Sequence, residues 1–317
     1  MPTGATAAAP PQRRPAAPKA GRASTFRRVL RGGGGSAWLF IAPAAVIIVA
    51  FMILPLLQSA WYSLHDWKVG ATQQEWLGGE NYQQLLGDEL FWNALRVTAV
   101  YSLVSIVALV VLGYATSAAL VRDSFWTKLA RSVFFFPMIV AVATIGLVWS
   151  FLLDPRIGLV GGLFEAVGWE PIGWLEDTAL ALPAVIFVNV WKTLGFTMII
   201  LLAGMKGVPE SLYEAARIDG ARGFQLTRYV TLPTIRPTLL FVVMITTIRS
   251  FEVFDLVYVM TGGGPLFATD TLINMLVREG IEYFNVGYAS AITIVLFGIM
   301  LALSLLQLRL FRYRDVD

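Results

Sequence analysis

Charged side chains lie deep inside two long apolar runs of this 317-residue sequence. Lys192 stands eleven residues into the run 181–204, and Arg249 stands twelve residues into the run 237–260. In helices that rise ~1.5 Å per residue, both charges would lie about 17–18 Å from the start of the run. A charge at the centre of a bilayer costs at least about 2.5–3.5 kcal/mol and usually serves a function. The pattern therefore indicates a polar path through an apolar protein.

Further polar and aromatic residues surround these two charges. Glu252 and Asp255 follow Arg249 by three and six residues and extend the polar band. The candidate substrate path comprises Asn189, Lys192, Thr193, Arg249, Phe251, Glu252, Phe254, Asp255 and Tyr258. Such a lining suits a sugar, because its hydroxyl groups need many hydrogen bonds and Phe251 and Phe254 offer faces for stacking. An Arg249–Glu252 ion pair that only joins helices explains the pattern equally well.

Composition places these runs in a membrane protein. Hydrophobic residues make up 57% of the chain and charged residues 14%, against about half and a quarter in soluble domains. The sequence has no cysteine, one histidine and no nucleophile–base pair, so we expect neither catalytic residues nor a metal site. It also lacks the G-x-x-x-x-G-K-[ST] loop that binds phosphates. The net charge of +3 is too small to indicate a nucleic-acid partner.

Six stretches are apolar for the roughly 20 residues that cross a bilayer. They are 37–61, 93–120, 130–152, 181–204, 237–260 and 286–309. Pro43, Pro55 and Pro137 lie inside them, where neighbouring helices satisfy the freed backbone groups. We therefore predict an all-α, polytopic membrane protein with six transmembrane helices.

Lysine and arginine residues predict the orientation of these helices. Of 24 such residues, 18 fall in the N-terminal tail, the second and fourth connections and the C-terminus. The opposite connections hold three, together with thirteen acidic residues. Basic residues are enriched on the cytoplasmic side, so both termini and the segment 205–235 are expected there, in the cell membrane.

The N-terminal segment 1–36 is rich in proline and alanine, basic and without periodicity. We interpret it as a disordered cytoplasmic tail that ends in a flexible glycine joint. A cleaved signal peptide is the alternative, but its apolar region usually spans only about 7–15 residues. The uncharged stretch Ala37–Trp61 is longer, which favours an uncleaved helix.

The segment "EAARIDGARGFQLTRYVTLP", residues 214–233, is amphipathic and charged in an otherwise apolar chain. Pro209 suits the start of a helix, Ser211 and Glu214 have capping-box spacing, and Gly220 suits its end. Asp219 is expected to cap a second short helix that runs to about residue 230. Pro233 is expected to stop that helix, and Pro237 to open the fifth span. The segment therefore predicts a helix–turn–helix elbow beside the membrane.

Three roles are open to this elbow. A helix that lies on lipid usually carries bulky apolar residues opposite lysines, which alanines and mixed charges fit poorly. A catalytic loop lacks its nucleophile and base. A docking element for a cytoplasmic protein fits best, because small alanines let another surface approach closely.

The run "EAARIDGA", followed eleven residues later by "LP", resembles the EAA loop of permease subunits of binding-protein-dependent ABC importers. The runs "WKTLGFTMIILLAGMKGVPESLYEAA", "FEVFDLVYVMTGGGP", "FNVGYASA" and "ARSVFFFPMIV" match as well, so the resemblance covers about residues 92–312. "FDLVYVMTGGGP" resembles the carbohydrate-uptake branch, which includes maltose, oligosaccharide and glycerol-3-phosphate permeases.

This resemblance implies the type I importer permease fold, in which 37–91 forms the first helix and outer loop, 92–312 the transmembrane domain and 313–317 the C-terminus. It implies a second homologous permease, two ATPases that use ATP and Mg²⁺, an extracytoplasmic sugar-binding protein, and no cofactor on this chain. In that family the elbow is a coupling helix that docks on the ATPase. The matching residues are Glu214, Ala215, Ala216, Arg217, Asp219, Gly220, Ala221, Leu232 and Pro233.

The chain departs from the family at two outer positions. The family often has Asn–Thr where this chain has Val97–Thr98, and Asn where it has Gly161. An ion- or proton-coupled secondary transporter that uses Glu252 and Asp255 as a relay is the alternative function. It predicts uptake by the chain alone, whereas a structural scaffold predicts none.

Overall fold

The computed structural model describes residues 34–71 and 74–311, and side chains within residues 41–310. The expectations for residues 1–33 and 312–317 lie outside the described residues. The chain divides into two compact units, residues 1–57 and 58–317.

The first unit is one apolar helical run. It consists of α2 (Gly34–Ile48), the π-helical turn η1 (Val49–Ile53) and the start of α3 (Leu54–Tyr62). Pro43 lies inside α2, and Pro55 follows η1, whose wider turn tolerates the missing N–H. Residues 41–62 are long and apolar enough to cross a membrane, in agreement with the first predicted span.

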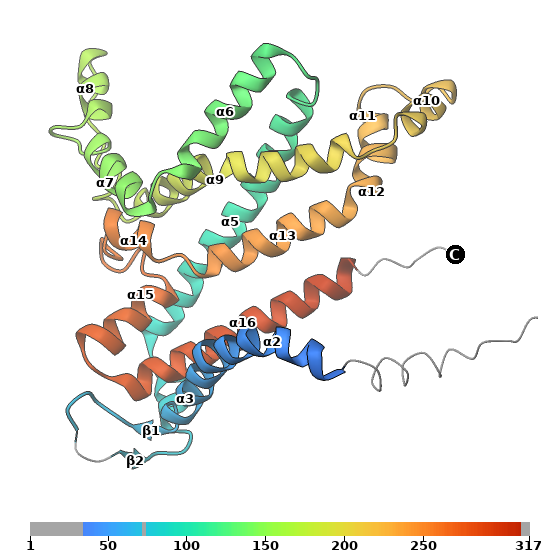
Figure 1. The fold of residues 1–317 in the computed structure, drawn as a ribbon. Coiled ribbons are helices and arrows are strands. Elements are labelled where there is room, and N and C mark those ends of the chain that lie inside the picture. Colours follow the sequence, from blue (N-terminus) through green and yellow to red (C-terminus); the bar gives the residue numbers. More distant parts are fainter. Residues whose placement is uncertain (1–33, 72–73, 312–317) are drawn as a thin grey trace, which may run out of the picture. The chain divides into compact units, whose positions relative to one another are not determined.

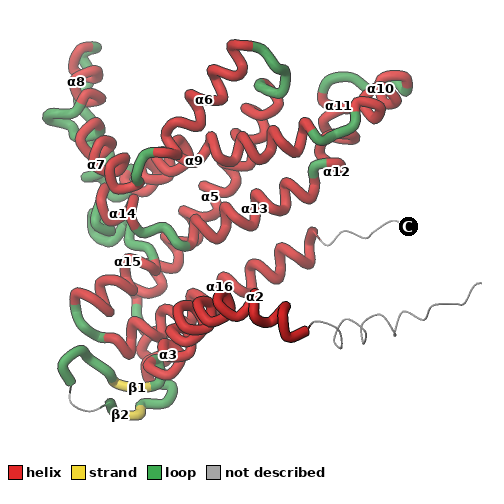
Figure 2. The backbone as a smooth tube through the Cα atoms, in the orientation of Figure 1, coloured by secondary structure: helices red, strands yellow, loops and turns green. Residues whose placement is uncertain are grey.

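The regular secondary structure of the second unit is almost entirely helical, and loops connect the helices (Figures 1 and 2). Its short hairpin pairs β1 (His65–Asp66) with β2 (Glu75–Trp76) in antiparallel register. The helices are α4 (Glu80–Gly87), α5 (Glu89–Ala119), α6 (Phe125–Ile139), α7 (Val142–Leu152), α8 (Leu159–Ala166), α9 (Ala181–Lys206), α10 (Glu210–Ile218), α11 (Phe224–Leu226), η2 (Thr227–Thr231), α12 (Leu232–Thr234), α13 (Arg236–Phe251), α14 (Asp255–Met260), α15 (Leu272–Val277), η3 (Arg278–Glu282) and α16 (Val286–Phe311).

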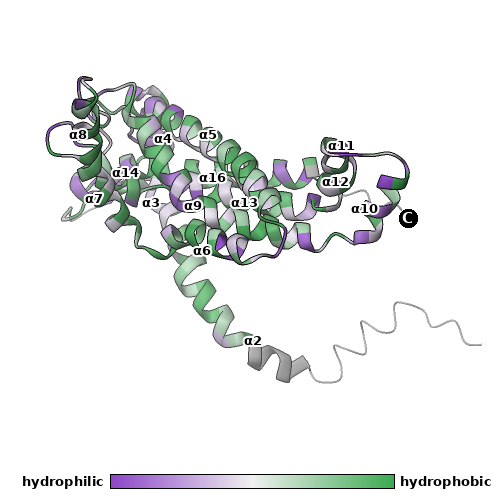
Figure 3. Cartoon of the chain, turned by 90° about the horizontal axis from the view of Figure 1, so that it is seen from above, coloured by the Kyte–Doolittle hydropathy of each residue, from purple (hydrophilic) through white to green (hydrophobic). Residues whose placement is uncertain are grey.

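Helix α5 organises the core of this unit, because it packs along both α9 and α13. Helix α6 packs on the other side of α9, where a side chain at Gly195 would overlap the backbone of Phe134. Helix α16 packs on α13, and α14 packs on α7. Apolar residues run along these helices, and hydrophilic residues gather at α10 (Figure 3). The all-α prediction is confirmed.

The third predicted span, 130–152, is not one helix. Helices α6 and α7 meet at an angle of 98°. Val140 and Ala141 at the junction are extended, with ψ of 139° and 140°, which interrupts the helical hydrogen bonds. Pro137 lies within α6, before the bend.

The fifth predicted span, 237–260, is also broken. Helix α13 ends at Phe251, and α14 starts at Asp255 after a non-helical link in which Phe254 has φ −136° and ψ −64°. Irregular backbone at membrane depth occurs where it is buried in protein or lines a cavity. By length and composition the described residues contain four candidate spans, or six if two bent pairs each count as one: α6 with α7, and residues 224–234 with α13.

Candidate functional site

The break between α13 and α14 borders a polar cavity of about 180 Å³. This volume is small beside the ~300–1,000 Å³ of typical ligand pockets. The lining residues are Leu109, Met138, Val142, Asn189, Lys192, Thr193, Phe196, Thr246, Arg249, Ser250, Glu252, Val253, Phe254, Asp255 and Leu256. We call this space the cavity. It collects side chains from α5, α6, α7, α9, α13 and α14.

The cavity brings together seven of the nine residues of the predicted path. Phe251 is absent because it is buried among residues of α5, α15 and α16. Tyr258 is absent too, but its ring stacks on that of Phe254 with centroids 5.1 Å apart. The assignment of a substrate path to these residues stays a prediction.

Several lining residues were missed by the sequence reading. Phe196 follows Asn189 and Thr193 on one side of α9, and Thr246 and Ser250 flank Arg249 on α13. Residues three or four apart share a helix face. That spacing could have identified Phe196 from Lys192 and Thr246 from Arg249, and Ser250 then follows Thr246 by four residues.

The predicted ion pair between Arg249 and Glu252 is not formed. The four ion pairs among the described residues involve other side chains. The Arg249 guanidinium instead lies 4.5 Å from the centroid of the Phe196 ring. The two residues cannot pair as neighbours on a continuous helix, because Glu252 caps the end of α13. Arg249 is therefore held against α9 by a cation–π contact.

Asn189 is oriented by a neighbour on α5. Its Nδ2 donates a hydrogen bond of 3.4 Å to Oγ of Ser105. Ser105 is fully buried, so the contact fixes one side of the amide group. The amide lines the cavity, where it offers both donor and acceptor chemistry to a polar ligand.

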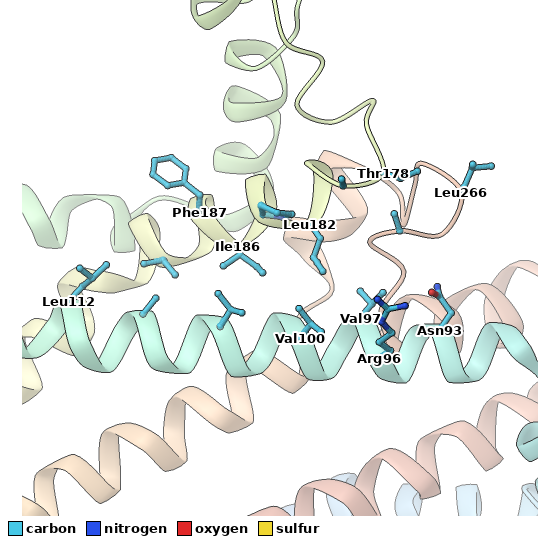
Figure 4. A pocket seen from close by; sticks show the side chains of 16 residues that line it. Asn93, Arg96, Val97, Val100, Leu112, Thr178, Leu182, Ile186, Phe187 and Leu266 are labelled. Carbon is cyan, nitrogen blue, oxygen red and sulfur yellow. The ribbon is translucent and has the colours of Figure 1, made fainter.

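A larger groove of about 750 Å³ lies elsewhere, between α5 and the start of α9 (Figure 4). Its walls are mainly aliphatic, such as Val100, Leu112 and Ile186, and Asn93 and Arg96 lie at one end. Asn93 is engaged, because its Nδ2 donates to the carbonyl of Phe267 at 2.8 Å. This groove offers few polar groups to a sugar, so the smaller cavity is the better candidate.

The second candidate region is the elbow, residues 205–235, at the end of α9 and the start of α13 (Figure 1). Gly220 has φ +84°, and the N–H of Ala221 donates to the carbonyl of Ala216 at 2.9 Å. Left-handed glycine after a helix is a common C-terminal cap. The predicted turn at Gly220 is confirmed.

Other details of the elbow differ from the prediction. Helix α10 starts directly after Pro209 without a side-chain cap, so Ser211 lies inside the helix and cannot form a capping box with Glu214. Asp219 ends α10, while α11 begins after Gly223 without a side-chain cap.

The second half of the elbow continues further than expected. Pro233 does not stop it, because the π-helical turn η2 leads into α12, where Pro233 occupies the first turn and needs no donor. The break comes at Ile235, and Pro237 then lies in the first turn of α13, as predicted. The two helical runs meet at 73°.

One face of α10 is attached to the transmembrane helices. Tyr213 packs on a cluster that includes Met205, Val208 and Ile235, and its hydroxyl lies 3.0 Å from Oγ1 of Thr231. Ala216 is half-buried on this side. The contact face assumed from the alanines is therefore partly turned inward.

The outward face carries bulky apolar residues that the sequence reading missed. Ile218, Phe224 and Tyr229 are 85%, 77% and 72% exposed. Glu214 and Ala215 are exposed as well. Large apolar side chains among charged ones on a protein surface mark an interaction site. In residues 217–229 large apolar residues alternate with charged ones, and this pattern could have identified the exposed apolar face from the sequence.

An ionic clamp fixes the base of the elbow. Asp123, in the α5–α6 connection, accepts from Lys206 Nζ at 2.7 Å and from Arg131 Nη1 at 2.9 Å. The hydrogen bonds from Lys206 and Arg131 hold the pKa of the Asp123 carboxyl below its usual range. Arg131 also donates from Nε to the carbonyl of Leu120 at 3.1 Å. The clamp joins α6 and the α5–α6 connection to the last residue of α9.

Comparison with known proteins identifies related chains. Residues 110–315 match the family of binding-protein-dependent transport system inner membrane components. The probable ABC transporter permease protein YurN of Bacillus subtilis is 34% identical over 280 residues, which cover 87% of this chain and 95% of that protein. The trehalose/maltose transport system permease protein MalF of Thermococcus litoralis is 32% identical over 87% of this chain and 94% of its own.

Solved structures agree in fold. A chain of a bacterial ABC transporter that imports the acidic polysaccharide alginate superposes with a TM-score of 0.78 at 21% identity. The match covers 92% of this chain and all of that one.

Proposed function

Because the chain belongs to the family of inner membrane components of binding-protein-dependent transport systems, we propose that it carries a sugar or sugar derivative through the cavity by alternating access. The observation that carries this proposal is the convergence of Asn189, Lys192, Thr193 and Arg249 on one cavity at a broken helix. Discontinuous helices at mid-membrane are typical of transport sites. The curated relatives include sugar permeases, which supports the substrate class.

The chain is a transport component of the inner membrane and not an enzyme. Its partners are a second permease, two ATPases and an extracytoplasmic binding protein. ATP and Mg²⁺ act on the ATPases, and this chain binds no cofactor. Family membership favours this ATP-driven scheme over ion-coupled secondary transport.

The elbow is the docking site for one ATPase in this scheme. Its exposed apolar residues suit a cleft, while Glu214 and Arg217 offer charge at the rim. Closure of the ATPases displaces the elbow, and α9 and α13 carry the displacement to the cavity. The loaded binding protein docks on the opposite side.

Both termini and the elbow lie in the cytoplasm in this proposal. The absence of cysteine makes a direct test simple, because single cysteines can be introduced one at a time. Gln225→Cys in the elbow should resist a membrane-impermeant maleimide in intact cells, whereas Glu170→Cys before α9 should react. The opposite labelling pattern would reverse the topology.

The transport function is tested by reconstitution of the full complex in liposomes. We expect ATP-dependent uptake of a labelled sugar that requires the binding protein. Asn189→Ala should reduce uptake about 5–13-fold, the loss expected for a hydrogen bond of ~1–1.5 kcal/mol, without loss of ATPase co-purification.

Asn93→Ala is the matched control, because Asn93 lies on α5 in the apolar groove and outside the cavity. Equal uptake by the Asn189 variant, the Asn93 variant and the unmodified complex would assign the cavity to helix packing. Failure of the complete complex to transport any sugar would overturn the function itself.

A further inference from the structure

Lys192 lines the cavity, and no carboxylate of the described residues forms an ion pair with it. The residue is only 8% exposed. Within the described part of the chain, the ion pairs involve Asp123, Glu210 and Asp270, none of them with Lys192. A buried charge without a partner is strongly unfavourable, and a protein keeps one where a ligand or partner supplies the counter-charge.

Arg249 adds a second positive charge to the same cavity. Lys192 lines the cavity from α9 and Arg249 lines it from α13, so both cations border the same space. Phe196 holds the guanidinium from one side at 4.5 Å and supplies no negative charge. Two like charges repel each other, and an anion between them offsets this repulsion.

The acidic residues of the cavity do not supply this anion. Glu252 and Asp255 line it as well, but both are exposed and neither forms an ion pair with Lys192 or Arg249 among the described residues. They lie beyond the end of α13, where the chain has left the helix that carries Arg249. The cavity is therefore positive between α9 and α13 and negative at the break.

We propose that Lys192 and Arg249 bind an anionic group of the transported sugar, such as a carboxylate, phosphate or sulfonate. The inference rests on the proposed function and names its substrate class. An ammonium and a guanidinium give short, charge-assisted hydrogen bonds to such oxygens. Thr193 and the part of the Asn189 amide that Ser105 does not hold line the same cavity and can contact the sugar hydroxyls.

The test compares two sugars that differ in one group, D-galacturonate and D-galactose. Binding to the complete importer in nanodiscs, without the binding protein, is measured by saturation-transfer NMR. We expect galacturonate to bind at least about tenfold more tightly, which corresponds to ~1.4 kcal/mol. Lys192→Gln and Arg249→Gln should each remove most of this preference, and Lys192→Arg should keep it.

Arg96→Gln is the matched control, since it removes a cation of α5 that lines the apolar groove and not the cavity. Equal binding of both sugars, or no binding of either, overturns the anion site. Loss of the second permease from Lys192→Gln with an unchanged preference also overturns it, because Lys192 would then pair with an acid of that subunit. Uptake of a neutral sugar by liposomes separates the two proposals. If the complex transports a neutral sugar, only the anion site is refuted; the transport function is refuted only if no sugar is transported.

Discussion

Replacement of Gly220 tests whether the geometry of the elbow controls coupling to the ATPase. Its φ of +84° is a conformation that costs most non-glycine residues about 1–2 kcal/mol. No atom lies within 4 Å of the position that a Cβ would take, so a side chain adds no steric clash. The whole penalty is therefore a backbone penalty, and it shifts the turn equilibrium by roughly 5–30-fold.

A graded series separates this backbone effect from side-chain bulk. Asparagine tolerates the left-handed region better than alanine, and β-branched valine tolerates it least. Coupling, measured as sugar transported per ATP hydrolysed in liposomes, should fall in the order Gly220, Asn, Ala, Val. Membrane insertion should be unchanged. Gly298→Ala is the control, because Gly298 lies within α16 with open space around it.

Two results would refute this reasoning. Wild-type coupling in Gly220→Val would show that the turn is not required. Equal damage by asparagine and valine would show that surface shape matters and the left-handed backbone does not.

Other parts of the chain give three further predictions. Glu214→Lys and Ala215→Trp should lower the yield of co-purified ATPase by about tenfold or more while the chain stays in the membrane; normal pull-down would move the docking site elsewhere. The isolated chain should show no ATP hydrolysis above background, and mutation-sensitive hydrolysis would contradict this. Asp123→Asn should raise ATP hydrolysis that is not coupled to uptake, whereas Asp154→Asn should not. The pKa of Asp123 is lower in the folded protein than the value of about 3.9 in the unfolded chain. The stabilisation by the clamp is therefore fully present above that unfolded-state pKa and is lost only as the pH falls through the lower folded-state pKa. Coupling should not change between pH 7 and 5 through this group.

The helices were predictable because hydropathy alone identifies apolar runs long enough to cross a bilayer. Their interruptions were not. Val140 and Ala141 are as apolar as their neighbours and carry no turn signal, yet they bend the chain by 98°. After the bend, α7 packs against α14, a contact between segments about a hundred residues apart. The residues near the bend do not indicate that distant contact.

In the candidate sites, too, some features could be predicted from the sequence and others could not. Gly220 and Pro237 were read correctly because their backbone preferences are intrinsic to the residue. Phe251 was assigned to the path although it lies two residues after Arg249, and therefore on the far side of the same helix. The pairing of Arg249 with Glu252 assumed a helix that had already ended. Helical periodicity corrects the first error, but only the fold corrects the second.

Helices α9 and α13 connect the two candidate sites directly. Each contributes to the cavity near its middle or end and joins the elbow at its other end. Lys192 lies about 21 Å from Lys206 along α9, and Arg249 lies about 20 Å from Arg236 along α13, at ~1.5 Å per residue. The cations therefore stand at similar distances from the elbow. A movement that shifts α9 against α13 at the elbow would change the spacing of Lys192 and Arg249. If the ATPase docks on the elbow as proposed, its closure would therefore alter the affinity of the cavity for the proposed substrate.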